Sequence, residues 1–289
     1  MTLKRKLINI YLPPKEQGFL GQGHIARTLV GGDFRHSDPF IFLMDDDIDK
    51  KDNNPVGGPH PHAGFETVSL LIDGKLVEQT ESMEKGDFQI MTAGSGIVHT
   101  EIMDKPTKGR LFQMWLTLPK KDRWTEPRLQ ILNAAQVPVS AKDGVGIRLY
   151  SGSLAGISSP VLNYVPLIAA EITLELDRST TLGLPGNFNA FIVVISGNVA
   201  IGEEKQLLTA EEVGWLNHAD EEVASELQLK AGKDGVRLIL YAAKPQGEPI
   251  VSHGPFITDN EGQVQKLYQD FRHGRMDHIS TIPQQITIY

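Results

Sequence analysis

Two pairs of side chains with metal-binding chemistry, each spaced two residues apart, place the strongest constraint on how this chain folds. The first pair is His60 and His62, and the second is His99 and Glu101. Residues two apart in a β-strand project to the same face, so each pair can aim at one point if it lies on a strand. The spacing therefore predicts two neighbouring strands on which three imidazoles and one carboxylate converge.

Three neutral nitrogens and one anionic oxygen are a ligand shell for a first-row transition metal, with positions left for water, oxygen or substrate. A structural zinc site would more often use thiolates, and the chain has no cysteine. A lone histidine is more often solvated or hydrogen-bonded, but the joint spacing favours a metal site. Glu66 is a second candidate carboxylate, because strand parity puts residues 60, 62, 64 and 66 on one face if no bulge intervenes.

Composition favours an all-β protein without a nucleic-acid surface. The chain has 289 residues, 28 of them glycine and 17 proline, which suits many short strands and turns. Hydrophobic residues at 40% and charged residues at 22% are typical of a globular protein with a sizeable core. The formal charge of −8 argues against direct binding to nucleic acid, because such proteins present a broad basic surface to phosphates.

The amino terminus favours a cytoplasmic location. Residues 1–6 are basic, as in a signal peptide, but the apolar run at 7–12 is too short and Pro13 with Pro14 ends it. No apolar run reaches the length of a membrane span, so no membrane association is expected.

A weak internal repeat predicts two similar domains. Residues 191–197 resemble residues 67–74 at an offset of 123. The same offset places Gly183 and Pro185 where His60 and His62 would be, and Asn189 at the position of Glu66. His218 is a lone histidine near the second motif, so the second domain is expected to bind no metal.

We expect the boundary between the two domains within the charged, proline-containing segment 119–138. This gives a metal-binding domain over 1–135 and a second domain over 136–289. The apolar spacing in 261–272, with Asn260 as a cap, predicts a short helix that packs back on the first domain.

Two further segments stand out by composition. The glycines of residues 18–23 are not preceded by a strand and followed by a helix, so they predict a turn and not a phosphate loop. Residues 45–49 contain four acids without the spacing of a calcium loop, which favours a solvated acidic loop. His24 and His36 have no second ligand at a useful spacing and are expected to be surface or hydrogen-bonded histidines.

The motifs resemble those of the pirins, a family of the cupin superfamily. Residues 60–68 read His-Pro-His-x-Gly-Phe-Glu-Thr-Val, and residues 91–101 read Met-Thr-Ala-Gly-Ser-Gly-Ile-Val-His-x-Glu. An Asp-Pro-Phe segment at 38–40 and a Gly-Pro-Phe segment at 254–256 also match, although Thr258-Asp259 replaces the family's Met-Asn. The resemblance implies two cupin barrels of the double-stranded β-helix, or jelly-roll, type in one chain.

The resemblance also implies a site and an activity. The family's ligands correspond to His60, His62, His99 and Glu101, and its metal is iron. We therefore expect Fe(II), although the donor set accepts other first-row metals. Pirins of several sources act as quercetin 2,3-dioxygenases, which implies a flavonol and O2 as substrates, with Glu101 or Glu66 as the proton acceptor. Eukaryotic pirins act as cofactors of transcription factors, so a regulatory metal protein with protein partners is the alternative.

Overall fold

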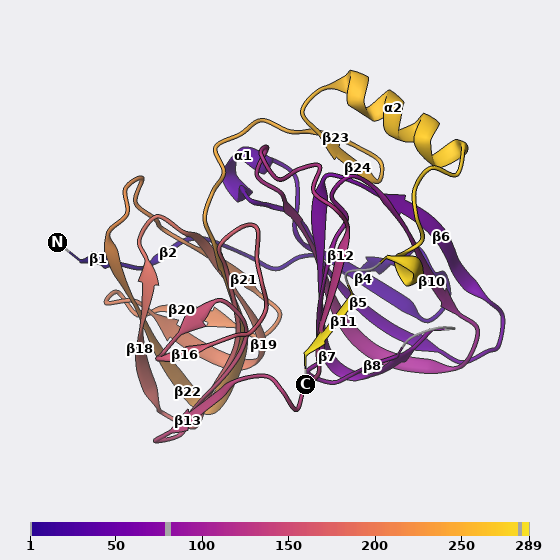
Figure 1. Cartoon of the computed structure of the whole chain (residues 1–289). Helices are drawn as coiled ribbons and strands as arrows, with labels where there is room; N and C mark the ends of the chain where they lie inside the picture. The colour runs from indigo at the N-terminus through magenta and orange to yellow at the C-terminus, as the bar shows by residue number, and fades with distance from the viewer. Residues whose placement is uncertain (1, 79–81, 283–284, 289) are drawn as a thin grey trace. The chain divides into compact units, whose positions relative to one another are not determined.

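The computed structural model describes residues 2–78, 82–282 and 285–288 and divides the chain into two compact units (Figure 1). One unit combines residues 14–136 with 246–289 and contains all the predicted ligands, so we call it the histidine barrel. The other combines residues 1–13 with 137–245, and we call it the second barrel. Each unit is therefore built from two separated stretches of the chain, in contrast to the continuous domains 1–135 and 136–289 that the sequence suggested.

Strand pairing at the chain ends explains this division. In the second barrel, the amino-terminal strand β2 (Leu7–Tyr11) pairs with β21 (Val213–Leu216). In the histidine barrel, the carboxy-terminal strand β25 (Gln285–Ile288) pairs with β12 (Arg128–Leu132). Backbone hydrogen bonds between strands far apart in sequence thus join each end of the chain to a barrel. A local sequence pattern cannot predict such pairing.

The histidine barrel consists of a large sheet and a two-stranded sheet that carries the predicted ligands. The large sheet has the order β25-β12-β9-β7-β11-β5-β4-β3, with β8 paired to β7, and the small sheet is β10-β6. The strands and helices of the histidine barrel, besides β12 and β25, are β3 (Glu16–Gln17), β4 (His24–Val30), α1 (Phe34–Ser37), β5 (Phe40–Lys50), β6 (Val56–His62), β7 (Phe65–Val77), β8 (Ser82–Glu84), β9 (Phe88–Thr92), β10 (Ile97–Met103), β11 (Thr107–Thr117), β23 (Val251–His253), β24 (Phe256–Thr258), α2 (Glu261–Arg272) and a 3-10 turn (Ile279–Thr281).

The second barrel is built on one ten-stranded sheet around an apolar core. Its order is β13-β14-β17-β22-β19-β21-β2, with β1, β18 and β20 joined to β22 or β19. The remaining strands are β1 (Leu3–Lys4), β13 (Val139–Lys142), β14 (Val145–Ser151), β15 (Ser153–Leu154), β16 (Ile157–Ser158), β17 (Leu167–Leu174), β18 (Ser179–Pro185), β19 (Asn189–Ile201), β20 (Gln206–Thr209) and β22 (Ala224–Ala243). Alternating side chains of β17, β19 and β22 are buried in one continuous core cluster.

The predicted repeat is visible in the strands. Shifted by 123 residues, β6 (Val56–His62) coincides with β18 (Ser179–Pro185), and β7 falls within one residue of β19. The all-β prediction is confirmed, since α1 and α2 are the α-helices among the described residues and both are short. In the part of the chain that the structure describes, no helix is long and apolar enough to cross a bilayer.

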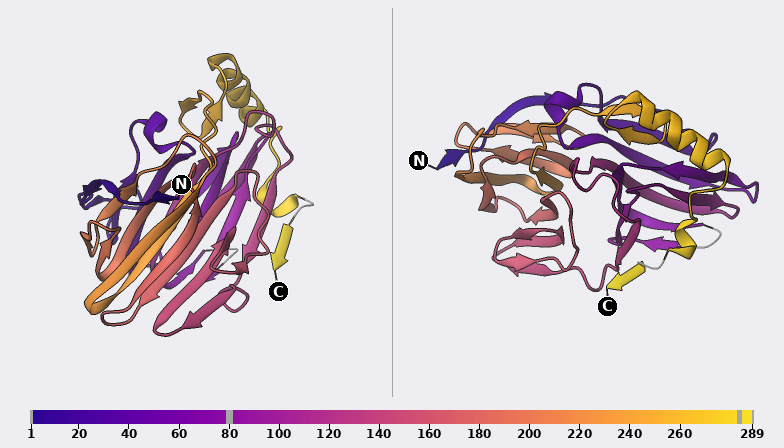
Figure 2. Two further views of the ribbon diagram at one scale, coloured as in Figure 1. Left: turned by 90° about the vertical axis from the view of Figure 1, so that its left-hand side faces the viewer. Right: turned by 45° about the horizontal axis from the view of Figure 1, so that its top comes forward.

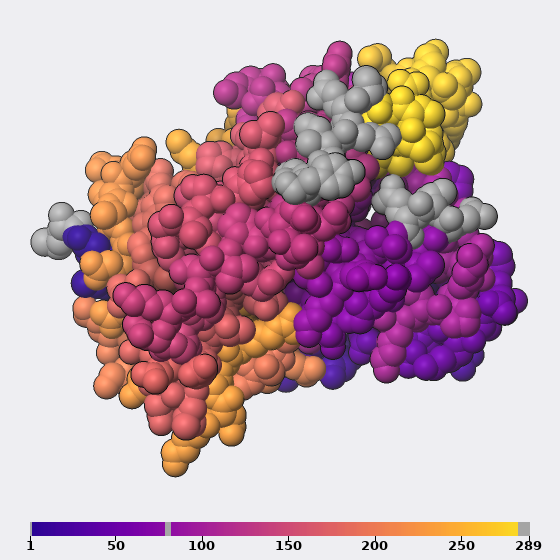
Figure 3. All heavy atoms as spheres, turned by 60° about the horizontal axis from the view of Figure 1, so that its bottom comes forward, coloured from indigo at the N-terminus to yellow at the C-terminus, as the bar shows by residue number. Residues whose placement is uncertain are grey.

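The carboxy-terminal segment completes the histidine barrel. Helix α2 begins after Asn260, whose side chain accepts a hydrogen bond from the amide of Gln263, as expected of a cap. Its residue Leu267 is buried in a cluster with Ala63 and Phe256. Figure 2 shows α2 on the outside of this barrel, and Figure 3 shows the yellow carboxy-terminal residues on its surface beside purple and magenta ones.

Candidate metal centre

The predicted ligands lie on β6 and β10, which form an antiparallel pair. His60 is directly opposite His99 in the register, and Glu101 is opposite Gly58. The close approach of the strands depends on Gly57, which has φ +85° and faces the backbone of Glu101 so closely that a Cβ would overlap its carbonyl oxygen. The structure thus brings both pairs together on two neighbouring strands, as the spacing predicts.

The three imidazoles are arranged around one point. One donor nitrogen of each of His60, His62 and His99 lies within 4.8 Å of the others. The ring centroid of His60 is 4.7 Å from the ring centroid of His62 and 5.6 Å from that of His99. Nδ1 of His60 donates to the carbonyl oxygen of Gly58 at 2.9 Å, which leaves its Nε2 lone pair available.

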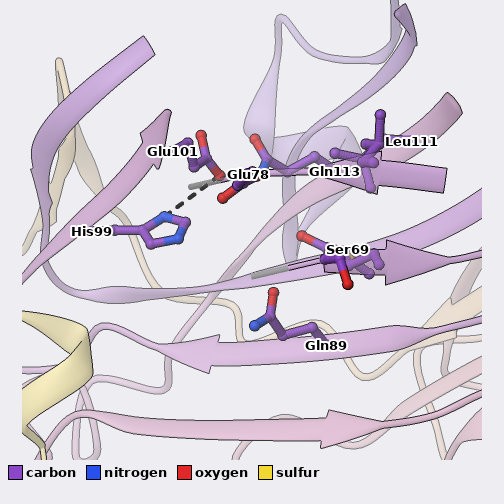
Figure 4. A pocket seen from close by; sticks show the side chains of 10 residues that line it. Ser69, Glu78, Gln89, His99, Glu101, Leu111 and Gln113 are labelled. Carbon is purple, nitrogen blue, oxygen red and sulfur yellow. Dashed lines mark hydrogen bonds and ion pairs between the residues drawn. The ribbon is translucent and has the colours of Figure 1, made fainter. Parts of the chain in front are cut away.

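Glu101 lies beside two of these histidines. Its Oε1 is 3.5 Å from Nδ1 of His99, and its Oε2 is 3.9 Å from Nε2 of His60. Gln113 on β11 donates its side-chain amide to Oε1 at 3.3 Å. Figure 4 shows His99, Glu101 and Gln113 lining the same small pocket. The carboxylate is therefore oriented from the large sheet as well as from its own strand.

His62 is the most deeply buried of the three histidines. It is 5% exposed, and its ring packs edge-on against Phe65 at 5.4 Å and Trp115 at 5.5 Å. Burial, together with the neighbouring imidazoles, lowers the pKa of His62 well below its usual range, so the ring is neutral. Its Nδ1 is buried without a hydrogen-bond partner, which fits a ring positioned for an additional ligand.

Glu66 is not brought to this cluster. It is completely buried, and its Oε1 accepts a hydrogen bond from the hydroxyl of Thr92 on β9 at 2.6 Å. Phe65 contacts His62 and Ser69 lines a pocket with Glu101, so the alternation of β7 points Glu66 to the opposite face of the sheet. Burial raises the pKa of Glu66 to about 7.

A cavity of about 410 Å³ opens beside the histidines within the same barrel. His60, His62 and Glu101 form part of its wall. The rest is mostly apolar and includes Phe19, Leu20, Phe42, Met44, Ile48, Met103, Leu111 and Trp115. Its size and apolar lining suit a flat aromatic molecule whose polar end reaches the cluster.

A second polar pair, which the sequence analysis did not predict, lies in this cavity. His24 and Asp46 both line it, and Nε2 of His24 lies 2.8 Å from Oδ1 of Asp46. The prediction of a solvated acidic loop at 45–49 is wrong, because these residues belong to β5 and Asp45 pairs with Arg27 and Arg110. The alternation of Asp46 with Met44 and Ile48 is the one local signal that could have placed it on the cavity face.

The second barrel has a different chemistry at the corresponding strand. Gly183 and Pro185 lie on β18, which matches β6 in the repeat, and Asn189 opens β19. His218 is exposed, with its Nδ1 near the carbonyl oxygen of Ala219. Among the described residues of both barrels, the convergent group of histidines is the one formed by His60, His62 and His99.

Comparisons with known proteins agree with this architecture. The family model described as "Pirin" matches residues 23–116, and the model for the pirin C-terminal cupin domain matches residues 169–277. A pirin-like protein of Solanum lycopersicum is 31% identical over 262 residues, covering 88% of each chain. The pirin of Rattus norvegicus is 31% identical over 283 residues, covering 93% of each chain.

Solved structures show the same fold. The GK1651 protein of Geobacillus kaustophilus is 29% identical with a TM-score of 0.76, covering 86% of this chain and 100% of its own. A quercetin 2,3-dioxygenase of Acinetobacter baumannii is 24% identical with a TM-score of 0.80, and the match covers 95% of this chain and 98% of that one. The bacterial pirin YhhW of Escherichia coli, solved in complex with nickel(II), is 18% identical with a TM-score of 0.59, and the match covers 82% of this chain and 99% of that one.

Family models therefore match both barrels, and relatives that share nearly a third of their residues align along most of the sequence. The two barrels are cupin barrels, and the chain belongs to the pirin family.

Proposed function

We propose that the chain is a metal-dependent dioxygenase that cleaves a flavonol such as quercetin at one metal ion held by His60, His62, His99 and Glu101. The observation that supports this most strongly is the convergence of three imidazoles, two of which, His60 and His62, lie in the wall of a largely apolar cavity. A substrate held in that cavity would present its polar edge to the metal and its rings to the apolar wall.

The residues present fit a first-row transition metal. The imidazole donors lie close enough to share one ion, and the buried Nδ1 of His62 has no hydrogen-bond partner, which fits a ring that would bind a metal. When bound, the metal would supply Lewis acidity and access to O2 next to the substrate. We propose Fe(II), which the family resemblance implies, while nitrogen and oxygen donors also accept manganese, cobalt, nickel, copper and zinc.

Glu101 is the group we assign to proton transfer. A flavonol must lose its 3-hydroxyl proton before oxygen can attack its ring, and a carboxylate within hydrogen-bond reach can accept that proton. The amide of Gln113 bonds Oε1 of Glu101, so Oε2 would serve both the metal and the substrate proton, with a different lone pair for each. Glu66 is excluded from this role because it faces away from the cavity.

The apolar wall orients the substrate and keeps water away. The ring centroid of Trp115 lies 4.0 Å from that of Phe65 and 4.4 Å from that of Phe42. These rings give the cavity an aromatic side on which a flat ring can stack. Exclusion of water strengthens the interaction between the substrate oxygens and the charged groups at the polar end.

The names of similar proteins are consistent with two functions. The Acinetobacter baumannii structures are named quercetin 2,3-dioxygenase, although likeness below 25% identity supports the fold and not the activity. The curated relatives are named pirin or pirin-like, a name that specifies no reaction. A regulatory protein that uses the metal to bind a protein partner is therefore the outcome to distinguish by experiment.

The test compares metal content and turnover in the same samples. We expect the iron-loaded wild type to consume quercetin and O2 and to release carbon monoxide, and the metal-free protein to do neither. His62→Ala should bind metal about 10-fold or more weakly, since ligand support of this kind contributes at least that much. His218→Ala, which changes an exposed histidine of the second barrel, should match the wild type.

Three outcomes decide between the interpretations. Full metal occupancy in His62→Ala would contradict the ligand assignment. Turnover that is unchanged in metal-free protein would contradict a metal mechanism. An iron-replete wild type without turnover would favour the regulatory function.

A further inference from the structure

The cavity contains a polar pair on the large sheet, away from the strands that carry the histidine cluster. His24 is 1% exposed and Asp46 is 6% exposed, and Nε2 of His24 donates to Oδ1 of Asp46 at 2.8 Å. Both residues line the 410 Å³ cavity. A carboxylate buried beside apolar residues such as Met44 and Ile48 is costly unless its hydrogen bonds are satisfied.

The glycine-containing loop at residues 18–23 fixes the imidazole of His24. The backbone amide of Leu20 donates to Nδ1 at 3.2 Å, so Nε2 carries the proton that Asp46 accepts. Gly18 lies so close to the ring that a Cβ there would overlap Nδ1. The loop predicted as a turn thus wraps around the imidazole and fixes its tautomer and orientation.

The pairing of strands connects Asp46 to the histidine cluster. Asp46 is directly opposite Leu111 in the register of β5 and β11, and Met44 is opposite Gln113. Asp46 is therefore a diagonal neighbour of Gln113 on the same face of the sheet. At such a position the long side chain of Gln113 can reach Asp46. Because Gln113 bonds Glu101, the cavity wall presents a line of polar groups from the metal site to Asp46.

We propose that Asp46, positioned by His24, accepts a hydrogen bond from a ring hydroxyl of the substrate and so selects polyhydroxylated aromatic molecules. Oδ1 is bonded to His24, and Oδ2 is the acceptor offered to the cavity. This inference rests on the proposed flavonol substrate and adds a second polar contact, distinct from the metal ligands. His24 acts as a positioning residue and does not touch the substrate.

The selectivity follows from desolvation. A ligand that fills the cavity displaces water from Oδ2, so a ligand with a hydroxyl at that place replaces the lost hydrogen bond. A ligand without one leaves a buried carboxylate oxygen unpaired. For a charged acceptor this difference corresponds to a change in affinity of about 10- to 100-fold.

The test measures binding without turnover. Metal-loaded protein is titrated calorimetrically under argon with quercetin and with 3-hydroxyflavone, which keeps the 3-hydroxyl and 4-carbonyl groups but lacks the other ring hydroxyls. The measured quantity is the ratio of the two dissociation constants. We expect the wild type to prefer quercetin by about 10-fold or more.

The variants separate the carboxylate from its surroundings. Asp46→Asn keeps the bond to His24 but replaces the Oδ2 acceptor with an amide donor, so the preference should fall by about 10-fold. Asp47→Asn makes the same change at the exposed next residue of β5 and should keep the wild-type ratio. His24→Leu should also lose the preference, whereas His24→Gln, which retains a donor for Asp46, should restore part of it.

Each outcome bears on one of the two proposals or on both. A wild-type ratio in folded Asp46→Asn overturns the inference, and a wild-type ratio in His24→Leu overturns the positioning role. If neither flavonol binds the wild type, the flavonol function and this inference both fail. If the ratios behave as expected but aerated samples show no oxygen consumption, the dioxygenase function fails and the inference stands.

Discussion

At the scale of single residues, the turn at Gly64 decides which carboxylate faces the cluster. Gly64 has φ +86°, and a Cβ there would overlap the carbonyl oxygen of Ile257. The backbone reverses the parity of the strand at this point, so His62 and Glu66 point into different environments although they are four residues apart. The assumption of one uninterrupted strand from 60 to 66 fails because of this glycine.

The buried Glu66 makes stability depend on pH. Burial raises its pKa from 4.5 to about 7, so the folded chain keeps a proton that the unfolded chain releases. The unfolded state then binds fewer protons between about pH 4.5 and 7, and the contribution of Glu66 to the free energy of unfolding falls as pH rises through that window. Relative to Glu66→Gln, the wild type should lose up to roughly 3 kcal/mol from pH 4.5 to 7.5.

Chemical denaturation at several pH values checks this prediction. Glu16→Gln, a change on the exposed strand β3, should leave the pH dependence of the wild type unaltered. Parallel curves for the wild type and Glu66→Gln would show that Glu66 titrates normally in the folded state.

At the scale of elements, the pairing of β6 with β10 sets the distance between the two halves of the site. Gly57 sits opposite Ile102, and its φ of +85° and close contact with Glu101 leave no space for a side chain. Gly57→Ala should separate the strands and move Glu101 away from His60. We expect metal binding to weaken by about 10-fold or more, measured by competition with a chelator.

Gly32→Ala is the matched control for this change. Gly32 has a similar φ of +91°, but no atom lies within 4 Å of the position of a Cβ. The Gly32→Ala variant should therefore have the backbone strain of about 1–2 kcal/mol without the steric overlap that Gly57→Ala creates. If both variants bind metal equally well, strand separation at Gly57 is not what positions Glu101.

The sequence predicts those elements whose information is local. The spacing of His60 with His62, and of His99 with Glu101, specifies strand parity, and the two strands are observed. The helix at 261–272 has its cap and its apolar spacing within one segment and is observed with those bounds. The burial of Asp46 depends on His24 from a neighbouring strand, and no local pattern encodes such a partner.

At the scale of the whole chain, the same limit applies to the barrel boundaries. The offset of 123 residues correctly pairs β6 with β18, because a repeat is a property of the sequence itself. The assignment of the chain ends depends on which strand edges they cover, and covering an edge satisfies hydrogen bonds that would otherwise be exposed. The carboxy-terminal stretch is thus part of the histidine barrel although it follows the second barrel in sequence.

This arrangement predicts that residues after 245 support the metal site without supplying a ligand. The amide of Val98, next to His99, donates to the carbonyl oxygen of Asp277 at 2.8 Å, and Thr100 lies 2.8 Å from Nε2 of His278. A chain ending at Pro245 should therefore lose most of its metal affinity, and His278→Ala should lose a smaller part, both measured by metal content after dialysis. A chain ending at Ile282 keeps both contacts and should bind metal as the wild type does. Full metal binding by the chain ending at Pro245 would mean that β6 and β10 hold the site unaided.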